Sequence, residues 1–283
     1  MFPLNIAIHY ILGYYNHMKL LITGGSGYIG SYIVKYYTEY GHQVLAPTSS
    51  ELDLTDLTAT EEYMAAHPVD CIINCAFYGR EMIHDPDDNF YIINMAMFGN
   101  LLSQSRYYNK FVHLGSGYEY DNERNIDFAD EDDIFYVEPK LPYAALKHMQ
   151  AKHLNDRDNC YNLRLFGLAH RSEPSNRFFK RLLTENKVVI GEDRRHDFFN
   201  LEDLPQVVDL VLNNTIRHKA INCVYQNKYT LSQQAKMFCD IKGLNYNKVI
   251  IEGESNRGYT GNNTRLASYN LPLLGLELGM FGY

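Results

Sequence analysis

Long apolar runs and clusters of positive charge are both missing from this sequence. No stretch approaches the ~20 apolar residues that a membrane-spanning helix needs. No block of lysine or arginine occurs, and the formal net charge is −8. An acidic chain without a basic patch is a poor partner for nucleic acid or for an anionic membrane. We therefore expect a cytoplasmic protein that binds neither, although a small anionic ligand would need only local positive groups.

Cysteine is also scarce. Cys71 and Cys75 are four positions apart on a predicted strand, where their side chains would lie far apart. A zinc site needs a tighter cluster with further ligands. The full set is odd in number and scattered: Cys71, Cys75, Cys160, Cys223 and Cys239. It is typical of reduced thiols in the cytosol, so we predict neither a disulfide framework nor a metal site.

The first seventeen residues contain no lysine or arginine, so they lack the charged start of a secretion signal. Directly after Met18, Lys19–Thr23 already has the pattern of a first strand. We therefore expect residues 1–17 to be an extension outside the fold. They are either an appended segment or the product of an upstream start codon, and we favour the second interpretation.

Strands and helices alternate through the first half of the chain. The expected strands are Lys19–Thr23, Gln43–Ala46, Cys71–Cys75, Phe111–Leu114 and Asn162–Phe166, and the expected helices are Tyr28–Tyr40, Thr58–Ala66, Phe90–Tyr107 and Ala144–Leu154. This order predicts an α/β fold with a doubly wound parallel sheet over residues 18–167. The pattern then changes, so residues 168–283 should form mainly a smaller C-terminal domain, with residues 193–224 returning to the sheet.

A glycine-rich loop follows the first strand and opens a helix. It reads Thr23-Gly24-Gly25-Ser26-Gly27-Tyr28-Ile29-Gly30. Glycine permits the tight turn, lets the backbone approach a pyrophosphate, and lets helix and strand pack closely. The helix N-terminus then faces the negative phosphates. We therefore predict a dinucleotide cofactor here.

The end of the second strand bears on which dinucleotide binds. NAD-binding strands often end in an acidic residue that contacts the ribose hydroxyls, but here Ala46 is followed by Pro47-Thr48-Ser49-Ser50. Hydroxyls without an acid favour a 2′-phosphate, so we expect NADP(H), with NAD(H) as the alternative. Asp53, a little further on, either contacts the adenine or, with Asp56, simply caps the next helix.

Tyr143 and Lys147 are four residues apart, so they share one face of their expected helix. A nearby ammonium group favours the phenolate form of a tyrosine and prepares it for proton transfer with a carbonyl or an alcohol. Ser116 lies just past the end of an earlier strand, where ligands meet the carboxyl edge of a parallel sheet. We predict that these three side chains are catalytic, although Ser116 alone would also suit a turn.

The order of these motifs resembles that of the extended short-chain dehydrogenases/reductases, the NAD-dependent epimerase/dehydratase family. The match includes Asn74-Cys75-Ala76, Asn94, Leu163–Gly167 and the segment His196–Asp203. The resemblance implies a Rossmann-type domain, a C-terminal domain that binds a nucleotide-linked sugar, and a homodimer. The cofactor-binding residues that it implies, together with the motifs above, are Gly24, Gly27, Tyr28, Ile29, Gly30, Thr48, Asp53, Leu54, Asn74, Cys75, Ala76 and Lys147. The substrate-binding residues that it implies are Tyr118, Asn176, Arg177, Arg195, His196 and Arg257.

Departures from the family pattern reduce the number of reactions that fit this sequence. Dehydratases of the family carry an Asp-Glu pair where this chain has Gly117 and Tyr118. The motifs look nearer to dTDP-4-dehydrorhamnose reductase and to GDP-fucose synthase-like reductases. Our first hypothesis is reduction of a 4-keto-6-deoxy nucleotide sugar for surface-glycan precursors. The alternatives are a 4-epimerase with tightly bound NAD and, from another class, a non-catalytic dinucleotide sensor.

Overall fold

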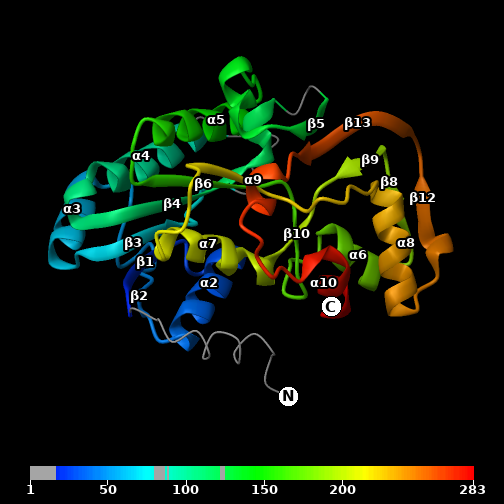
Figure 1. Cartoon of the computed structure of the whole chain (residues 1–283), viewed down its shortest axis with the longest axis horizontal. Helices are drawn as coiled ribbons and strands as arrows, with labels where there is room; N and C mark the ends of the chain where they lie inside the picture. The colour runs from blue at the N-terminus through cyan, green and yellow to red at the C-terminus, as the bar shows by residue number, and fades with distance from the viewer. Residues whose placement is uncertain (1–16, 80–86, 88, 122–124) are drawn as a thin grey trace.

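The computed structural model describes residues 17–79, 87, 89–121 and 125–283, so the expected extension lies outside the described residues except for His17. A six-stranded parallel sheet forms the centre of the protein (Figure 1). Its order is β2-β1-β3-β4-β6-β11. The strands are β1 (Lys19–Thr23), β2 (Gln43–Leu45), β3 (Val69–Asn74), β4 (Tyr108–Ser116), β6 (Cys160–Leu165) and β11 (Ala220–Cys223). The prediction of a doubly wound α/β fold is confirmed.

Helices cover both faces of this sheet because successive side chains of a strand point to opposite faces. Leu20 and Ile22 pack with α2 (Tyr28–Glu39) and α7 (Leu204–Leu212) on one face. Leu21 packs toward the other face, which α3 (Leu57–Ala66), α4 (Phe90–Ser103) and α5 (Pro142–Asn155) cover (Figure 1). The chain runs from β1 outward to β2 and then back to β3 on the other side of β1. This reversal opens a crevice at the carboxyl ends of β1 and β3, which is where such sheets bind ligands.

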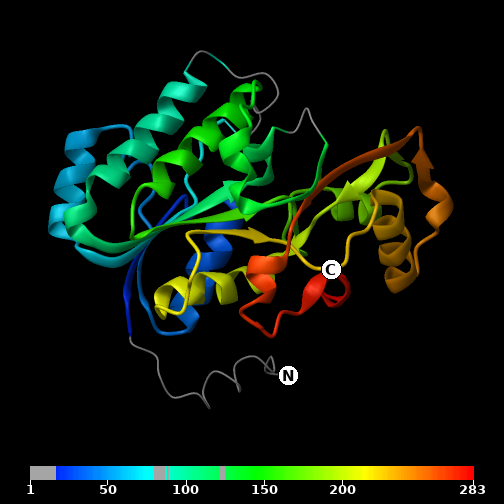
Figure 2. The ribbon, with the colours of Figure 1, turned by 45° about the horizontal axis from the view of Figure 1, so that its top comes forward.

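A smaller lobe lies beside the sheet (Figure 2). Strand β13 (Glu254–Gly261) pairs with both β5 (Ile126–Ala129) and β9 (Asp193–His196). The lobe has its own apolar core, which includes Phe179, Phe238 and Met280. Its other elements are α6 (Phe178–Thr184), β8 (Val188–Ile190), α8 (Leu231–Lys242), β12 (Val249–Ile251) and α10 (Gly275–Phe281). Within residues 193–224, β11 belongs to the main sheet and α7 packs on it, whereas β9 belongs to this lobe.

Short elements connect these parts. They are β7 (Leu168–Ala169), β10 (Phe199–Asn200) and α9 (Thr264–Ala267), with 3-10 turns η2 (Ser105–Tyr107), η3 (Gly117–Tyr120), η4 (Glu131–Tyr136), η5 (Leu201–Asp203) and η6 (Tyr246–Lys248). None of the helices in the described residues is long and apolar enough to cross a membrane. All five cysteines are free thiols, and the described residues hold no cluster of histidine, cysteine or carboxylate side chains suited to a metal ion.

The neighbouring helices α4 and α5 present a partly apolar outer face, which generates the first prediction. Ile92 is 65% exposed and Met149 is 38% exposed, whereas Leu101 and Leu146 are buried within their own subunit. We expect two copies to pair through the exposed side chains. Light scattering at micromolar concentration should return twice the 32.8 kDa chain mass, and Ile92→Asp should return the single-chain mass. Leu57→Asp, at an exposed position on α3, is the matched control, and a monomeric unsubstituted protein would reject the pairing.

Candidate active site

A cavity of about 390 Å³ lies at the carboxyl ends of the central strands. Six separate parts of the chain line it: the glycine loop, the end of β3, the end of β4, the start of α5, the end of β6 with the residues that follow it, and Arg177. Its lining residues are Gly24, Gly27, Tyr28, Ile29, Gly30, Asn74, Cys75, Ala76, Phe77, Leu114, Gly115, Ser116, Tyr118, Tyr143, Lys147, Leu165, Phe166, Gly167, Leu168 and Arg177. The cavity therefore brings together most of the cofactor residues and all three catalytic residues that the sequence predicts.

The glycine loop fits a bound pyrophosphate. Gly24 has a φ of +65°, and a Cβ atom there would lie 2.6 Å from the Cys75 carbonyl oxygen. A Cβ atom on Gly30 would overlap the Gly24 carbonyl group. Helix α2 begins directly after Gly27, and no side chain caps its first turn. Its leading N–H groups are therefore left for an anionic ligand in the cavity.

The Asn74 side chain, at the end of β3, forms hydrogen bonds to both neighbouring strands, β1 and β4. Its Oδ1 accepts hydrogen bonds from the Thr23 hydroxyl at 2.7 Å and from the Ala76 N–H at 3.3 Å. Its Nδ2 donates to Nδ1 of His113, 3.2 Å away on β4. The side chain is 4% exposed, so these bonds fix the floor of the cavity in a dry environment.

Tyr143 and Lys147 lie one turn apart at the start of α5 and line the same cavity as Ser116. Lys147 Nζ donates to the Leu114 carbonyl oxygen at 3.1 Å. Burial lowers the pKa of Lys147 to about 8, although Glu119 opposes that shift. Burial also raises the pKa of Tyr143 to about 12, and the Ser116 hydroxyl only partly offsets it. In the protein alone, Tyr143 is therefore held as the phenol, whereas the sequence suggested that the ammonium group would favour the phenolate.

Comparison with known proteins agrees with this geometry. Residues 20–223 match the model of the NAD dependent epimerase/dehydratase family, and this match spans more than half of the chain. The chain belongs to this family. It is a nicotinamide-dependent enzyme, and the resemblance seen in the sequence is confirmed.

Individual members of the family show how far the likeness extends. GDP-L-colitose synthase of Yersinia pseudotuberculosis is 28% identical over 258 residues, which span 80% of this chain and 82% of that protein. A GDP-mannoheptose C4 reductase from Campylobacter jejuni, solved with NADP bound, has a TM-score of 0.79 at 19% identity and covers 95% of this chain and 98% of its own. UDP-glucose 4-epimerase from Thermotoga maritima has a TM-score of 0.75 at 20% identity, covering 93% and 96%. The two solved structures share the fold.

Three aromatic side chains, Tyr118, Tyr259 and Phe166, pack together beside Tyr143, and we call them the aromatic wall. The Tyr118 ring lies 5.3 Å from that of Tyr143 and 5.4 Å from that of Tyr259, and Phe166 contacts Tyr259 at 5.1 Å. Tyr259 was missed by the sequence analysis because it stands on β13, far along the chain, and carries no local motif. Its hydroxyl is buried without a hydrogen-bond partner among the described residues, and the Ser116 hydroxyl partly offsets the rise of its pKa on burial. The Tyr259 hydroxyl therefore lies close to the Ser116 hydroxyl, behind the residues that line the cavity.

The basic side chains expected to bind substrate fall into two groups. Arg177 lines the cavity, and its buried Nε has no hydrogen-bond partner among the described residues. Arg195 instead forms an ion pair with Asp127 on β5. Because side chains alternate along a strand, Arg194 and His196 share the opposite face of β9, where the Arg194 guanidinium lies 5.8 Å from the centre of the Tyr259 ring.

The positive charges of Arg194 and Arg177 affect the neighbouring His196. The ring stacks on Phe198 at 4.5 Å and packs against Tyr259 at 4.9 Å. Burial, together with Arg194 and Arg177, lowers the pKa of His196 to about 3. The imidazole is therefore neutral near pH 7, and the two arginines supply the charge. Asn176 and Arg257 are exposed and do not line the cavity.

The expected contacts at the end of β2 are different from those in the structure. Thr48, Asp53 and Leu54 do not line the cavity. The Glu51 carboxylate, in the turn beyond β2, accepts hydrogen bonds from the Thr48 N–H at 2.7 Å and from its hydroxyl at 2.9 Å. No acid ends the strand itself, but one lies beside Thr48.

The two aspartates that follow have structural partners. Asp53 accepts from the N–H and hydroxyl groups of Thr55, at 2.9 and 2.7 Å. Asp56 caps α3 by accepting from the Ala59 N–H at 3.0 Å. These bonds fit the capping alternative better than an adenine contact.

The glycine loop generates the second prediction. Gly30→Ala should abolish measurable dinucleotide binding, because its Cβ atom would overlap rigid backbone and force α2 away from the loop. Gly99→Ala on α4 is the matched control, since no atom lies within 4 Å of a Cβ placed there. Fluorescence titration with NADPH measures both affinities. Unchanged binding by Gly30→Ala would show that the pyrophosphate does not cross this loop.

Proposed function

We propose that this protein is an NADP(H)-dependent reductase of a 4-keto-6-deoxy nucleotide-linked sugar used for surface-glycan precursors. The proposal depends on one observation: Ser116, Tyr143 and Lys147 line the same cavity as the glycine loop. The names of the relatives support it, since one is a GDP-L-colitose synthase and another a GDP-mannoheptose C4 reductase with NADP bound.

The chemistry divides between the cofactor and these side chains. When bound, the nicotinamide supplies the hydride that reduces the sugar carbonyl group. Tyr143 Oη donates a proton to the carbonyl oxygen as negative charge develops there. Because burial keeps Tyr143 protonated up to a pKa of about 12, the hydroxyl is in its donating form at neutral pH. Ser116 orients the same oxygen by a second hydrogen bond.

Lys147 positions this pair. Its ammonium group is held by the Leu114 carbonyl oxygen, one helical turn beyond Tyr143, where it can bind the hydroxyls of the nicotinamide ribose. The aromatic wall of Tyr118, Tyr259 and Phe166 excludes water from the reacting carbonyl group.

The diphosphate of the substrate needs positive charge at the entrance of the same cavity. Arg177 lines the cavity, and its buried Nε has no hydrogen-bond partner among the described residues. The Arg194 guanidinium lies over the Tyr259 ring and forms only a long ion pair, 3.8 Å, with Glu192. We propose that these two arginines bind the diphosphate, in place of Arg195 and Arg257.

A 4-epimerase that retains NAD is the second candidate. Glu51 favours it, because an acid in the turn after β2, beside Thr48, would suit the ribose hydroxyls of NAD and repel a 2′-phosphate. An epimerase uses the same three catalytic side chains and keeps its cofactor through each cycle. The two candidates therefore differ in how tightly the dinucleotide is held.

The third prediction tests the proton donor. Tyr143→Phe should bind NADPH normally and lose turnover by several orders of magnitude, because it keeps the ring and removes the hydroxyl. Turnover is measured on GDP- and dTDP-linked 4-keto-6-deoxy sugars. Tyr108→Phe, whose hydroxyl contacts the Leu102 carbonyl away from the cavity, is the control. A Tyr143→Phe protein with near-normal rates would remove Tyr143 from catalysis.

The fourth prediction distinguishes reductase from epimerase. The purified protein should release little dinucleotide on denaturation, because a reductase exchanges its cofactor in every cycle. The dinucleotide-free protein should bind NADPH more tightly than NADH, at most about tenfold, since tenfold corresponds to ~1.4 kcal/mol. Glu51→Gln should widen the preference, whereas Glu62→Gln, exposed on α3, should not. Stoichiometric bound NAD would replace the reductase by the epimerase.

A further inference from the structure

A buried carboxylate lies directly beneath the catalytic serine. Glu119, in the η3 turn, is 0% exposed. Its Oε1 accepts a hydrogen bond from the Ser116 N–H at 2.9 Å, and its Oε2 accepts from Asn162 Nδ2 at 2.9 Å and from Arg164 Nε. Ser116 Oγ in turn accepts from the Tyr118 N–H, so serine and glutamate cap the turn reciprocally. The backbone of Ser116 is therefore fixed by this carboxylate.

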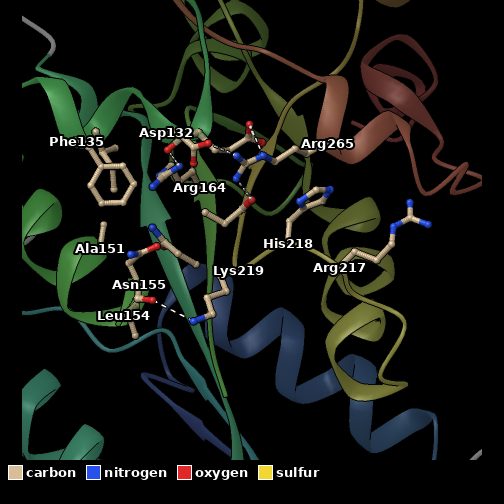
Figure 3. A pocket seen from close by; sticks show the side chains of 14 residues that line it. Asp132, Phe135, Ala151, Leu154, Asn155, Arg164, Arg217, His218, Lys219 and Arg265 are labelled. Atoms are coloured by element: carbon tan, nitrogen blue, oxygen red, sulfur yellow. Dashed lines mark hydrogen bonds and ion pairs between the residues drawn. The ribbon is translucent and has the colours of Figure 1, made fainter. Parts of the chain in front are cut away.

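The counterion of Glu119 is equally buried. Arg164, on β6, is 1% exposed, and it also donates to the Tyr120 hydroxyl and to the Glu131 carbonyl oxygen, each at 3.0 Å. Figure 3 shows it at a second cavity of about 220 Å³, close to Asp132 and Arg265. Buried charges are costly unless they are paired and hydrogen-bonded, and here the two charges are paired, with both carboxylate oxygens and two guanidinium nitrogens in hydrogen bonds.

Close packing leaves the carboxylate no freedom to move. A Cβ atom on Gly115 would overlap both Glu119 Oε1 and Asn162 Oδ1, so only glycine fits between the carboxylate and the strand that carries Ser116. Two interpretations are open at this point: the ion pair ties β4 to β6, or it also acts on the neighbouring catalytic groups. Helix α5, which carries Tyr143 and Lys147, packs against the η3 turn, and His148 Nδ1 on that helix lies 2.9 Å from the Glu119 carbonyl oxygen. This packing favours the second.

We propose that Glu119 is a positioning residue, which holds Ser116 by its backbone N–H and supplies a fixed negative charge to Lys147 and Tyr143, with Arg164 as its counterion. This inference rests on the proposed catalytic roles of those three side chains. It would hold equally for a reductase and for an epimerase, since both use them.

The charge acts in the same direction on both titrating groups. Glu119 raises the pKa of Lys147, opposing the effect of burial, and it adds to the rise at Tyr143. The titratable or charged groups that face Lys147 are Glu119, Cys75 and His113. Those that face Tyr143 are Glu119, Tyr118, Tyr259 and Arg177, together with the Ser116 hydroxyl. Of these, Glu119 is the carboxylate common to both.

Loss of the Glu119 charge should therefore make the protein lose activity at a lower pH. Reduction needs the ammonium form of Lys147 and the phenol form of Tyr143, so activity is lost as pH rises through either pKa. Without the carboxylate both pKa values fall. The alkaline limb of the turnover profile, and the pH above which dinucleotide affinity declines, should therefore move to lower pH.

The fifth prediction uses Glu119→Gln, which keeps the shape and can still accept from the Ser116 N–H. The ratio of kcat at pH 9 to kcat at pH 7 should fall by about threefold or more, which corresponds to half a pH unit. NADPH affinity measured over the same range should shift in the same direction. This second readout needs no sugar substrate, so a failure of the proposed reaction, seen as no turnover by the unsubstituted protein, does not obscure it.

Matched variants separate charge from stability. Glu119→Gln leaves Arg164 unpaired and should lower Tm, whereas the double variant Glu119→Gln/Arg164→Met should recover part of that loss and keep the alkaline shift. Glu119→Asp retains the charge, so it should keep the unsubstituted alkaline limb while losing kcat through a less firmly held Ser116. Arg265→Met, which breaks the ion pair with Asp132 in Figure 3, should lower Tm with no pH shift.

Two results would overturn the proposal. The first is an unshifted pH dependence of both turnover and NADPH affinity in folded Glu119→Gln. The second is an equal shift in Arg265→Met, which would assign the effect to loss of stability.

Discussion

The site depends on close contacts between backbone segments at the turn that connects β1 to α2. Gly24 lies against the Cys75 carbonyl group, and Gly30 lies against Gly24 itself. These approaches bring the start of α2 to the crevice between β1 and β3. Asn74 then links that crevice to β4, whose end carries Ser116. A side chain at either glycine would push apart the start of α2 and the other residues that line the cavity.

The parts of this arrangement that the sequence predicted are local ones. The glycine loop is continuous in the chain, and Tyr143 and Lys147 are one helical turn apart, so their relation follows from helix geometry. The alternation of strands and helices is also a local pattern, and it predicted the parallel sheet. Because the carboxyl ends of parallel strands meet at one edge, the position of Ser116 at the end of a strand was enough to predict that it lies near the loop.

The parts that the sequence could not provide depend on contacts between distant segments. Arg164 is 45 residues from Glu119, and neither position belongs to a pattern that links them. Tyr259 reaches Ser116 from the far end of the chain. The β9 segment Asp193–His196 is polar and only half-buried throughout, so its sequence does not indicate which of Arg194 and Arg195 faces the cavity. The contact between Glu51 and Thr48 depends on how the turn after β2 folds, so the sequence pattern does not indicate it.

The pairing of β13 with β5 has a consequence for how members of this family exchange parts. β5 comes from the chain between β4 and α5, within the first half of the sequence, yet it pairs with β13, which carries Tyr259 in the smaller lobe. The lobe is therefore not a self-contained module. In a chimaera that joined residues 168–283 to the first half of another family member, β13 would have to pair with the β5 of that other protein. Tyr259 would likewise have to pack against a residue of the other protein in place of Tyr118. Recombination that preserves the site would have to transfer β5 along with the lobe, as a second and separate fragment.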